Sequence, residues 1–301
     1  MELTDIVAID TMSRPFYCEP ELAKPLFKYW EVQQMVSGSF AGVAKRLKIK
    51  PGEEWKVLGK LGPGSVPGVV KEMDEIGVQY MFIDQGKAWS RRHHEYWGYY
   101  SLDTLRRLID ESGGRLIGGA SYNPFRIKEE LEEIEKAVKE YGFKYIWAHP
   151  ITYGLRPDDK KMYPLYIKCM ELDIPCCLQV GHSAEPLPSE PGHPMYADEV
   201  AMDLPDLKLV LTHTGFPWIQ EWISMIWRHN NVYGNIGAYY PSDLDPAIVK
   251  FMNGRGQNKI MWATNGFGLT RCKKEFLDLP LKDKVKVKVL RDNAVKLFNL
   301  E

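Results

Sequence analysis

The sequence predicts a single (β/α)8 barrel, and two observations lead to that fold class. Eight short apolar runs rich in β-branched residues recur along the 301 residues. Each run is too short for a buried helix and is almost continuously hydrophobic, as strands covered on both faces are. Amphipathic segments that repeat apolar residues every three to four positions lie between the runs. Eight strands that alternate with helices in one domain are typical of this barrel.

The expected strands share short length and high hydrophobicity. They cover residues 6–9, 78–83, 115–120, 144–148, 175–180, 207–211, 231–236 and 259–263. Helical periodicity is clearest at residues 101–110, 127–140 and 162–172. A doubly wound open sheet is the alternative, but no G-x-G-x-x-G motif follows the first run to favour it.

The connection after the first strand is unusually long, from residue 12 to residue 77. It contains an expected helix at residues 20–35 and a Gly/Pro-rich piece at residues 62–68. We therefore expect one domain over residues 1–301, with an insertion at roughly residues 15–72 that lies over the barrel mouth as a lid or dimer contact.

Composition excludes several classes of function. The hydrophobic share of 45% and the charged share of 26% fit an ordinary globular protein. The formal net charge of −1 gives no field that attracts nucleic acid or an anionic membrane. The start of the chain lacks signal-peptide features, so we expect a cytoplasmic protein. The five cysteines form no C-x-x-C pair and are expected to be packed free thiols.

Polar residues gather at the C-terminal ends of the expected strands, where a parallel barrel places its chemistry. They are Asp10, Met12, Arg14, Asp84, His149, Gln179, His182, His213, Asn235 and Asn265. His213 is the first candidate for proton transfer, because it lies between a strand and a tight Gly/Pro turn and has an ordinary pKa of ~6.5. Asn265 is a neutral amide that cannot act as a base near pH 7.

The segment at residues 89–97 (WSRRHHEYW) joins cations and aromatic rings just after the second strand. Two interpretations stay open. It is either a loop that grips an aromatic acid or an exposed basic loop with packed tryptophans.

Several motifs occur in a fixed order along the chain. They are residues 9–14 (IDTMSR), 179–183 (QVGHS), 213–218 (HTGFPW), 231–235 (NVYGN), 262–266 (WATNG) and 292–298 (DNAVKLF). This set resembles the amidohydrolase superfamily, in the branch that includes aminocarboxymuconate semialdehyde decarboxylase and resorcylate decarboxylase. The resemblance implies a (β/α)8 barrel, a small carboxylic acid as substrate and a zinc or manganese ion. Dimers are common in that branch, so a homodimer is possible.

Three departures from the family pattern concern the metal. The paired first-strand histidines fall on Met12 and Arg14, and the eighth-strand aspartate falls on Asn265. A thioether is soft and a guanidinium has no lone pair to donate, so neither replaces imidazole as a ligand of zinc or manganese. We therefore expect no cofactor, with a divalent ion as the less favoured possibility.

Arg14 adds a fixed positive charge where the resembled enzymes hold a cation. It could bind a substrate carboxylate or polarise a carbonyl. The alternative is an Arg14 that faces solvent or pairs with Asp10 or Glu19.

The sequence thus favours an enzyme that cleaves a small, aromatic or unsaturated carboxylic acid without a metal, with decarboxylation preferred over hydrolysis. The expected catalytic residues are His213, His182 and Asn265, and the expected substrate-binding residues are Arg14, Met12, His149, Gln179 and Asp10. One alternative is a metal-dependent hydrolase that recruits Asp10, His149 or Asp84. The other is an inactive relative that binds a ligand or supports a partner subunit.

Overall fold

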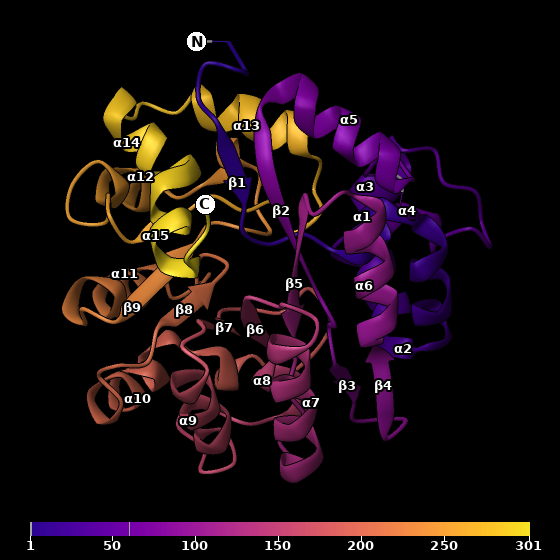
Figure 1. Ribbon diagram of the computed structural model, residues 1–301. Coiled ribbons are helices and arrows are strands. Elements are labelled where there is room, and N and C mark those ends of the chain that lie inside the picture. Colours follow the sequence, from indigo (N-terminus) through magenta and orange to yellow (C-terminus); the bar gives the residue numbers. More distant parts are fainter. Residues whose placement is uncertain (1, 60) are drawn as a thin grey trace.

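The computed structural model describes residues 2–59 and 61–301. Its centre is a parallel sheet of eight strands whose order in space is β1-β2-β5-β6-β7-β8-β9-β10 (Figure 1). The strands are β1 (Ala8–Asp10), β2 (Val78–Asp84), β5 (Leu116–Ala120), β6 (Tyr145–Ala148), β7 (Cys176–Gln179), β8 (Leu209–Thr212), β9 (Val232–Asn235) and β10 (Ile260–Met261). All eight lie where the hydrophobic runs place them, and the predicted α/β barrel class is confirmed.

Backbone hydrogen bonds join the first strand to the last. Thr11 N donates to Trp262 O at 3.2 Å, and Met12 O accepts from Thr264 N at 3.3 Å and from Asn265 N at 2.7 Å. The residues that follow β1 and β10 are therefore neighbours. This closure brings together positions more than 250 residues apart in sequence.

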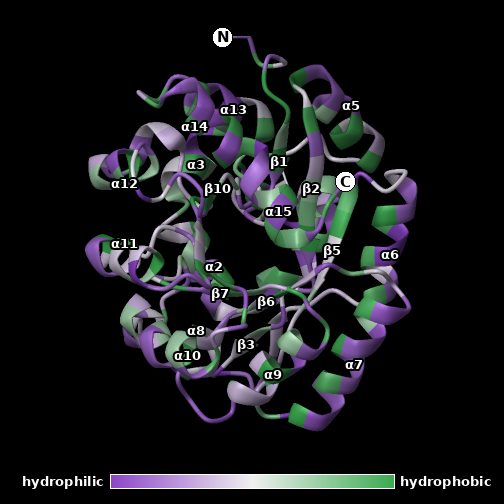
Figure 2. Ribbon diagram, turned by 60° about the vertical axis from the view of Figure 1, so that its left-hand side comes forward, coloured by the Kyte–Doolittle hydropathy of each residue, from purple (hydrophilic) through white to green (hydrophobic). Residues whose placement is uncertain are grey.

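Amphipathic helices surround the strands (Figure 1). They are α5 (Val66–Ile76), α6 (Leu102–Glu111), α7 (Ile127–Lys139), α9 (Tyr163–Glu171), α10 (Ala197–Asp203), α11 (Ile219–Arg228), α12 (Pro246–Met252) and α13 (Leu269–Leu277). Figure 2 shows their hydrophobic and hydrophilic residues on separate faces. The helices predicted at residues 101–110, 127–140 and 162–172 are confirmed as α6, α7 and α9. Short helices occupy several connections: α8 (Pro150–Tyr153), η2 (Glu190–Gly192), η3 (Pro194–Tyr196) and η4 (Pro241–Asp243).

The C-terminal segment fills one end of the barrel. It consists of α14 (Asp283–Val287), the π-helical turn η5 (Lys288–Asp292) and α15 (Asn293–Phe298). The Phe298 ring lies edge-on to Phe82 at 4.8 Å between centroids, inside an apolar cluster that also contains Met12. This end of the barrel is a packed core, so any site must lie at the opposite end.

The long first connection forms a layer over that opposite end. It contains α1 (Pro15–Cys18), the 3-10 helix η1 (Pro20–Lys28), α2 (Trp30–Ser37), α3 (Ala41–Arg46) and α4 (Lys56–Gly59). We call these five elements, with the adjoining Leu61, the cap. The helix expected at residues 20–35 is broken into η1 and α2, because Pro25 lies inside η1 and Tyr29 takes an extended conformation. The next helix, α5, packs on the outside of the barrel against β2.

One small sheet lies outside the barrel. β3 (Ala88–Ser90) and β4 (Glu95–Gly98) pair as an antiparallel hairpin within the segment rich in cations and rings. In the part of the chain that the structure describes, no helix has both the length and the hydrophobicity to cross a membrane.

Candidate active site

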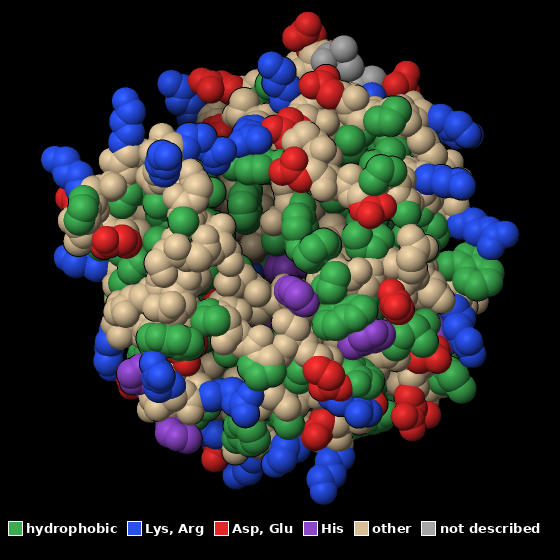
Figure 3. Space-filling model, turned by 180° about the vertical axis from the view of Figure 1, so that it is seen from behind, with side chains coloured by type: hydrophobic (Ala, Val, Ile, Leu, Met, Phe, Trp, Pro, Cys, Tyr) green, Lys and Arg blue, Asp and Glu red, His purple; other side chains and the backbone are tan. Residues whose placement is uncertain are grey.

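A cavity of about 440 Å³ lies between the C-terminal ends of the strands and the cap. Strand ends contribute its polar wall, which includes Arg14, His149, Gln179, His213 and Asn265. Figure 3 shows a hollow on this face with histidine side chains in it and hydrophobic side chains around it. Six of the eight residues expected in the site thus line one cavity, these five and His182.

Arg14 is the central charged group of the cavity. Its Nε donates to Asn265 Oδ1 at 2.8 Å, and its Nη1 bridges both carboxylate oxygens of Asp84 at 3.2 and 3.3 Å. The guanidinium carbon lies 4.2 Å from the ring centroid of Trp147, which is a cation–π contact. Among the described residues nothing accepts a hydrogen bond from Nη2, so that nitrogen remains able to donate to a ligand.

Asp84 is fully buried beside this cation. Burial raises the pKa of its carboxyl to about 6, while Arg14 and the Gly86 N–H pull the pKa back toward its ordinary value. The carboxyl is therefore mostly ionised at pH 7, when it neutralises Arg14, and protonates in mild acid. The net charge of the pair changes within an accessible pH range.

Asn265 is held by its own backbone. It has a φ of 54°, in the left-handed region that asparagine tolerates better than most residues, and its N–H donates to Met12 O. Asp10 fixes the preceding residue, because its carboxylate accepts from Thr264 N at 2.9 Å and from Thr264 Oγ1 at 2.6 Å. The amide that faces Arg14 is thus placed by contacts between the first and last strands.

Asp10 and Met12 are not brought into the cavity wall, although both were expected to bind substrate. Asp10 is fully buried on Thr264, and burial raises its pKa to about 7. Met12 is 1% exposed and packs in the apolar barrel interior beneath the site. Asp10 thus positions Thr264, and Met12 is part of the hydrophobic core.

His213 and His149 are both buried and near Arg14. Burial first, and the Arg14 charge second, lower the pKa of His213 to about 3 and place the pKa of His149 well below its usual range. Both imidazoles are therefore neutral at pH 7. A neutral imidazole can accept a proton or share a hydrogen bond, but it holds no extra proton to give away.

The tautomer of His213 follows from its surroundings. Within the described residues its Nδ1 is buried without a partner, while its backbone N–H donates to Asn235 Oδ1 at 3.1 Å. A proton on Nδ1 has no acceptor, so the neutral ring carries its proton on Nε2. His213 also has a φ of 68°, an uncommon conformation for histidine that functional sites often contain.

A chain of hydrogen bonds along the cavity wall ends at a carboxyl. His149 Nε2 lies 3.2 Å from Ser183 Oγ, and the Ser183 hydroxyl donates to Glu185. Burial raises the pKa of Glu185 above its ordinary value. Glu185 is the carboxyl among the described residues that line the cavity, and the serine links it to the histidine.

His182 lies apart from the other histidines. It is exposed, and its ring makes edge contacts with Phe216 and Trp218 at 6.0 and 5.5 Å between centroids. It therefore belongs to the aromatic rim of the mouth rather than to the polar wall.

The hairpin β3–β4 divides the segment at residues 89–97 in two. Ala88, Trp97 and Gly98 line the cavity. Arg91 and Arg92 occupy the exposed turn, where Arg92 packs over Trp30 of the cap at 4.5 Å. Within residues 89–97, Trp97 lines the cavity, whereas the two arginines are exposed and do not line it.

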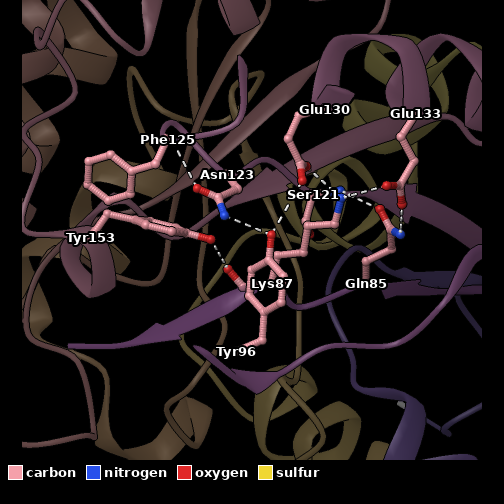
Figure 4. Close-up of polar contacts among 9 residues, drawn as sticks. All are labelled: Gln85, Lys87, Tyr96, Ser121, Asn123, Phe125, Glu130, Glu133 and Tyr153. Atoms are coloured by element: carbon pink, nitrogen blue, oxygen red, sulfur yellow. Dashed lines mark hydrogen bonds and ion pairs between the residues drawn. The ribbon is translucent and has the colours of Figure 1, made fainter. Parts of the chain in front are cut away.

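A buried polar network anchors this hairpin to the barrel (Figure 4). The Lys87 ammonium is 2% exposed and contacts Glu130 at 2.6 Å and Glu133 at 3.2 Å, both on α7. Gly86 and Ala88, on either side of Lys87, line the cavity. The ion pair thus fixes one wall of the site from behind.

The amidohydrolase family model matches residues 70–300. The chain belongs to the amidohydrolase family. The match begins after the cap, so β1, Met12 and Arg14 lie outside it. This family is one of enzymes, which confirms the class of protein expected from the motifs. No curated protein matches the chain in sequence.

Solved structures with the same fold span the whole chain. An uncharacterized TIM-barrel protein from Bordetella bronchiseptica is 21% identical with a TM-score of 0.75, over 98% of this chain and 99% of that one. 2,6-Dihydroxybenzoate decarboxylase from Rhizobium is 16% identical with a TM-score of 0.66, over 100% and 99%. 5-Carboxyvanillate decarboxylase from Novosphingobium aromaticivorans, complexed with manganese, is 16% identical with a TM-score of 0.66, over 99% and 97%.

The residues of this site do not fit a divalent metal. In residues 2–59 and 61–301, no group of three or more His, Cys, Asp or Glu side chains could hold an ion. Two buried carboxylates near the missing ligands already have other partners: Asp10 contacts Thr264, and Asp84 pairs with Arg14. A guanidinium also repels a cation from the same space. One neighbour of the same fold is complexed with manganese, whereas the described part of this chain has no cluster of metal ligands.

The sequence missed three residues of this wall. Glu185 and Ser183 lie in a proline-rich loop with no periodic pattern, and Trp147 is one apolar residue in a buried strand. Only their approach to Arg14 and His149 in space reveals them.

Proposed function

We propose that this protein is a carboxy-lyase that removes CO2 from an aromatic or unsaturated carboxylic acid without a metal ion. One observation carries the proposal: the Arg14 guanidinium is fixed in the cavity by Asn265, Asp84 and Trp147, with one nitrogen left to donate. Such a preorganised cation binds a carboxylate and stabilises negative charge that develops near it.

The reaction needs one proton delivered to carbon while the bond to the carboxylate breaks. In its protonated form Glu185 gives that proton, and the electron pair of the breaking C–C bond stays on the carbon and forms the new C–H bond as CO2 leaves. Glu185 then regains a proton from solvent. His213, with its neutral ring and Nε2–H, donates a hydrogen bond to the substrate rather than a proton.

Decarboxylation asks less of this site than hydrolysis does. Hydrolysis needs a base that activates water, and Asn265 cannot serve. Asp84 is occupied by Arg14, and the pKa of His213, near 3, makes it a weak base.

The test is CO2 release from a panel of hydroxybenzoic and α,β-unsaturated acids by protein purified with and without chelator. We expect turnover that chelator leaves intact and that Arg14→Met removes. Activity lost to chelator and restored by manganese or zinc contradicts the metal-free route. An Arg14→Met variant with full turnover contradicts the role of the cation, and binding without turnover across the panel favours the ligand-binding alternative.

A further inference from the structure

The cavity has two chemically different halves. Its floor carries the polar wall at the strand ends, and its roof is the cap. The roof residues are aliphatic and come from η1, α2, α3, α4 and the adjoining loop: Leu26, Val32, Met35, Val43, Leu58 and Leu61. Phe40 and Phe267 complete this half and face each other at 5.7 Å between ring centroids.

The size of the cavity exceeds what a single-ring acid needs. Its volume is about 440 Å³. Pockets of roughly 300–1,000 Å³ hold drug-sized ligands. A benzoate bound on Arg14 leaves the apolar roof in contact with water, which is unfavourable.

The cap is tied to the loop after β7 and to the hairpin β3–β4, so the roof is held at separate points. Ser39 Oγ donates to Ala184 O at 3.0 Å on the loop after β7. Lys28 pairs with Glu95 of β4 at 2.7 Å. Glu31, which is 2% exposed, accepts from Ser90 Oγ of β3 at 2.7 Å. The height of the roof above Arg14 therefore limits the length of a ligand.

We propose that the site takes a monocarboxylic acid with an extended apolar body, larger than one ring, whose carboxylate meets Arg14 and whose body lies under the cap. The inference rests on the proposed function in one respect, the contact between Arg14 and the carboxylate. The apolar body contacts aliphatic side chains that offer no hydrogen bonds, so hydrophobicity and length set its affinity.

The experiment is calorimetric titration of the full chain with benzoate, 4-butylbenzoate and 4-octylbenzoate. We expect affinity to rise by about fourfold for each methylene group that the roof covers. 4-Butylbenzoate then binds at least tenfold more tightly than benzoate. Equal affinity for benzoate and 4-butylbenzoate overturns the proposal.

Two roof variants locate the tail. Val43 is partly exposed, so Val43→Trp narrows the roof without replacing a core side chain, and Leu61→Phe is a milder change at another point. Both are expected to cut the gain from benzoate to 4-butylbenzoate at least fivefold. Val70→Trp on α5, outside the cavity, is the matched control and keeps the gain. Each variant is checked for a native circular dichroism spectrum, and a gain that survives in both folded roof variants overturns the proposal.

A neutral analogue separates this inference from the proposed function. 4-Butylbenzamide keeps the apolar body and lacks the charge, so we expect it to bind at least tenfold more weakly than 4-butylbenzoate. If the amide binds as tightly as the acid and both lose affinity in Val43→Trp, the contact of the apolar body with the roof is supported and the role of Arg14 is refuted. If only the acid binds and the length of its alkyl chain has no effect on affinity, the role of Arg14 is supported and the contact with the roof is refuted.

Discussion

Arg14 donates a hydrogen bond from Nε to Asn265 Oδ1 at 2.8 Å, although 251 positions separate the two residues in the sequence. Asp84 holds the same guanidinium from β2. The ends of β1, β2 and β10, which are consecutive around the barrel, thus fix one cation. The family resemblance implies metal ligands on the first and last strands, and this chain has a guanidinium and an amide there.

Replacement of Arg14 tests the ion pair. Arg14→Met leaves the Asp84 carboxylate buried without a partner, and we expect a loss of about 3–5 kcal/mol in the free energy of unfolding at pH 8. Without Arg14 the pKa of Asp84 rises further above about 6, so the folded protein takes up a proton as pH falls and the loss shrinks at pH 5. Urea unfolding at the two pH values measures both. Arg46→Met, at an exposed position of α3, is the control, and an equal loss at both pH values contradicts the account.

The pH dependence of acid binding follows from Asp84. Above a pH of about 6 its carboxylate is ionised and opposes a second anion at Arg14, whereas below it the carboxyl is neutral. Benzoate affinity should therefore rise as pH falls from 8 to 5, by at most tenfold per pH unit because one proton is taken up.

Asp84→Asn is the variant that isolates this effect. The amide still accepts a hydrogen bond from Arg14 but carries no charge, so binding should be tighter at pH 8 and nearly independent of pH. Calorimetric titration with benzoate at several pH values gives both quantities. Asp206→Asn, in an exposed loop, should keep the wild-type profile, and an unaltered slope in Asp84→Asn refutes the assignment.

Metal affinity can be tested by restoring the family ligands. Asn265→Asp alone should not bind zinc, because Arg14 remains beside the new carboxylate. The triple variant Met12→His, Arg14→His and Asn265→Asp adds three ligands and removes the cation, so we expect about one equivalent of zinc after dialysis. Elemental analysis measures the zinc content of the wild type and of both variants. One equivalent of zinc in the wild type or in Asn265→Asp contradicts the prediction.

The role of Glu185 predicts a kinetic signature. On an acid identified by the panel, Glu185→Gln should lower kcat at least a hundredfold with little change in KM, because the amide cannot supply a proton to carbon. Ser183→Ala should have a smaller effect through His149. Glu190→Gln, exposed on the same loop, is the control. Wild-type kcat in Glu185→Gln means that another group donates the proton.

The network behind the hairpin is a test of stability rather than chemistry. Lys87→Met leaves Glu130 buried without its ammonium, and we expect a loss of about 3–5 kcal/mol in the free energy of unfolding. Lys128→Met removes an exposed i,i+4 pair with Glu132 on the same helix and should cost less than about 0.5 kcal/mol. Urea titrations of the two variants give the comparison, and similar losses contradict the structural role of Lys87.

Hydrophobic periodicity predicts the barrel because each strand and helix buries a local, repeating set of side chains. The cap and the hairpin β3–β4 are less predictable. Pro25 interrupts an otherwise helical pattern in the cap. The two strands of the hairpin are short, and the turn between them, residues 91–94, consists of two arginines and two histidines. In sequence this segment resembles an ordinary polar loop. In both places tertiary contacts decide the local structure.

The site residues were predictable as a set but not as partners. Strand ends predict that Arg14, His149, Gln179, His213 and Asn265 meet. Sequence proximity suggested Asp10 or Glu19 as the partner of Arg14. Instead Asp10 binds Thr264 and Glu19 binds Arg107, because parallel strands place Asp84, from the next strand, beside Arg14.

The contact between Arg14 and Asn265 has a consequence for the synthesis of the chain. As the ribosome extends the chain, Arg14 and Asp84 emerge early, and Thr264 and Asn265 follow only after all the other strands. A nascent chain arrested near residue 255 therefore contains Arg14 but lacks Asn265. It also lacks the backbone hydrogen bonds that join the first strand to the last and close the barrel. Benzoate should not protect such a chain from protease, whereas it should protect the released protein.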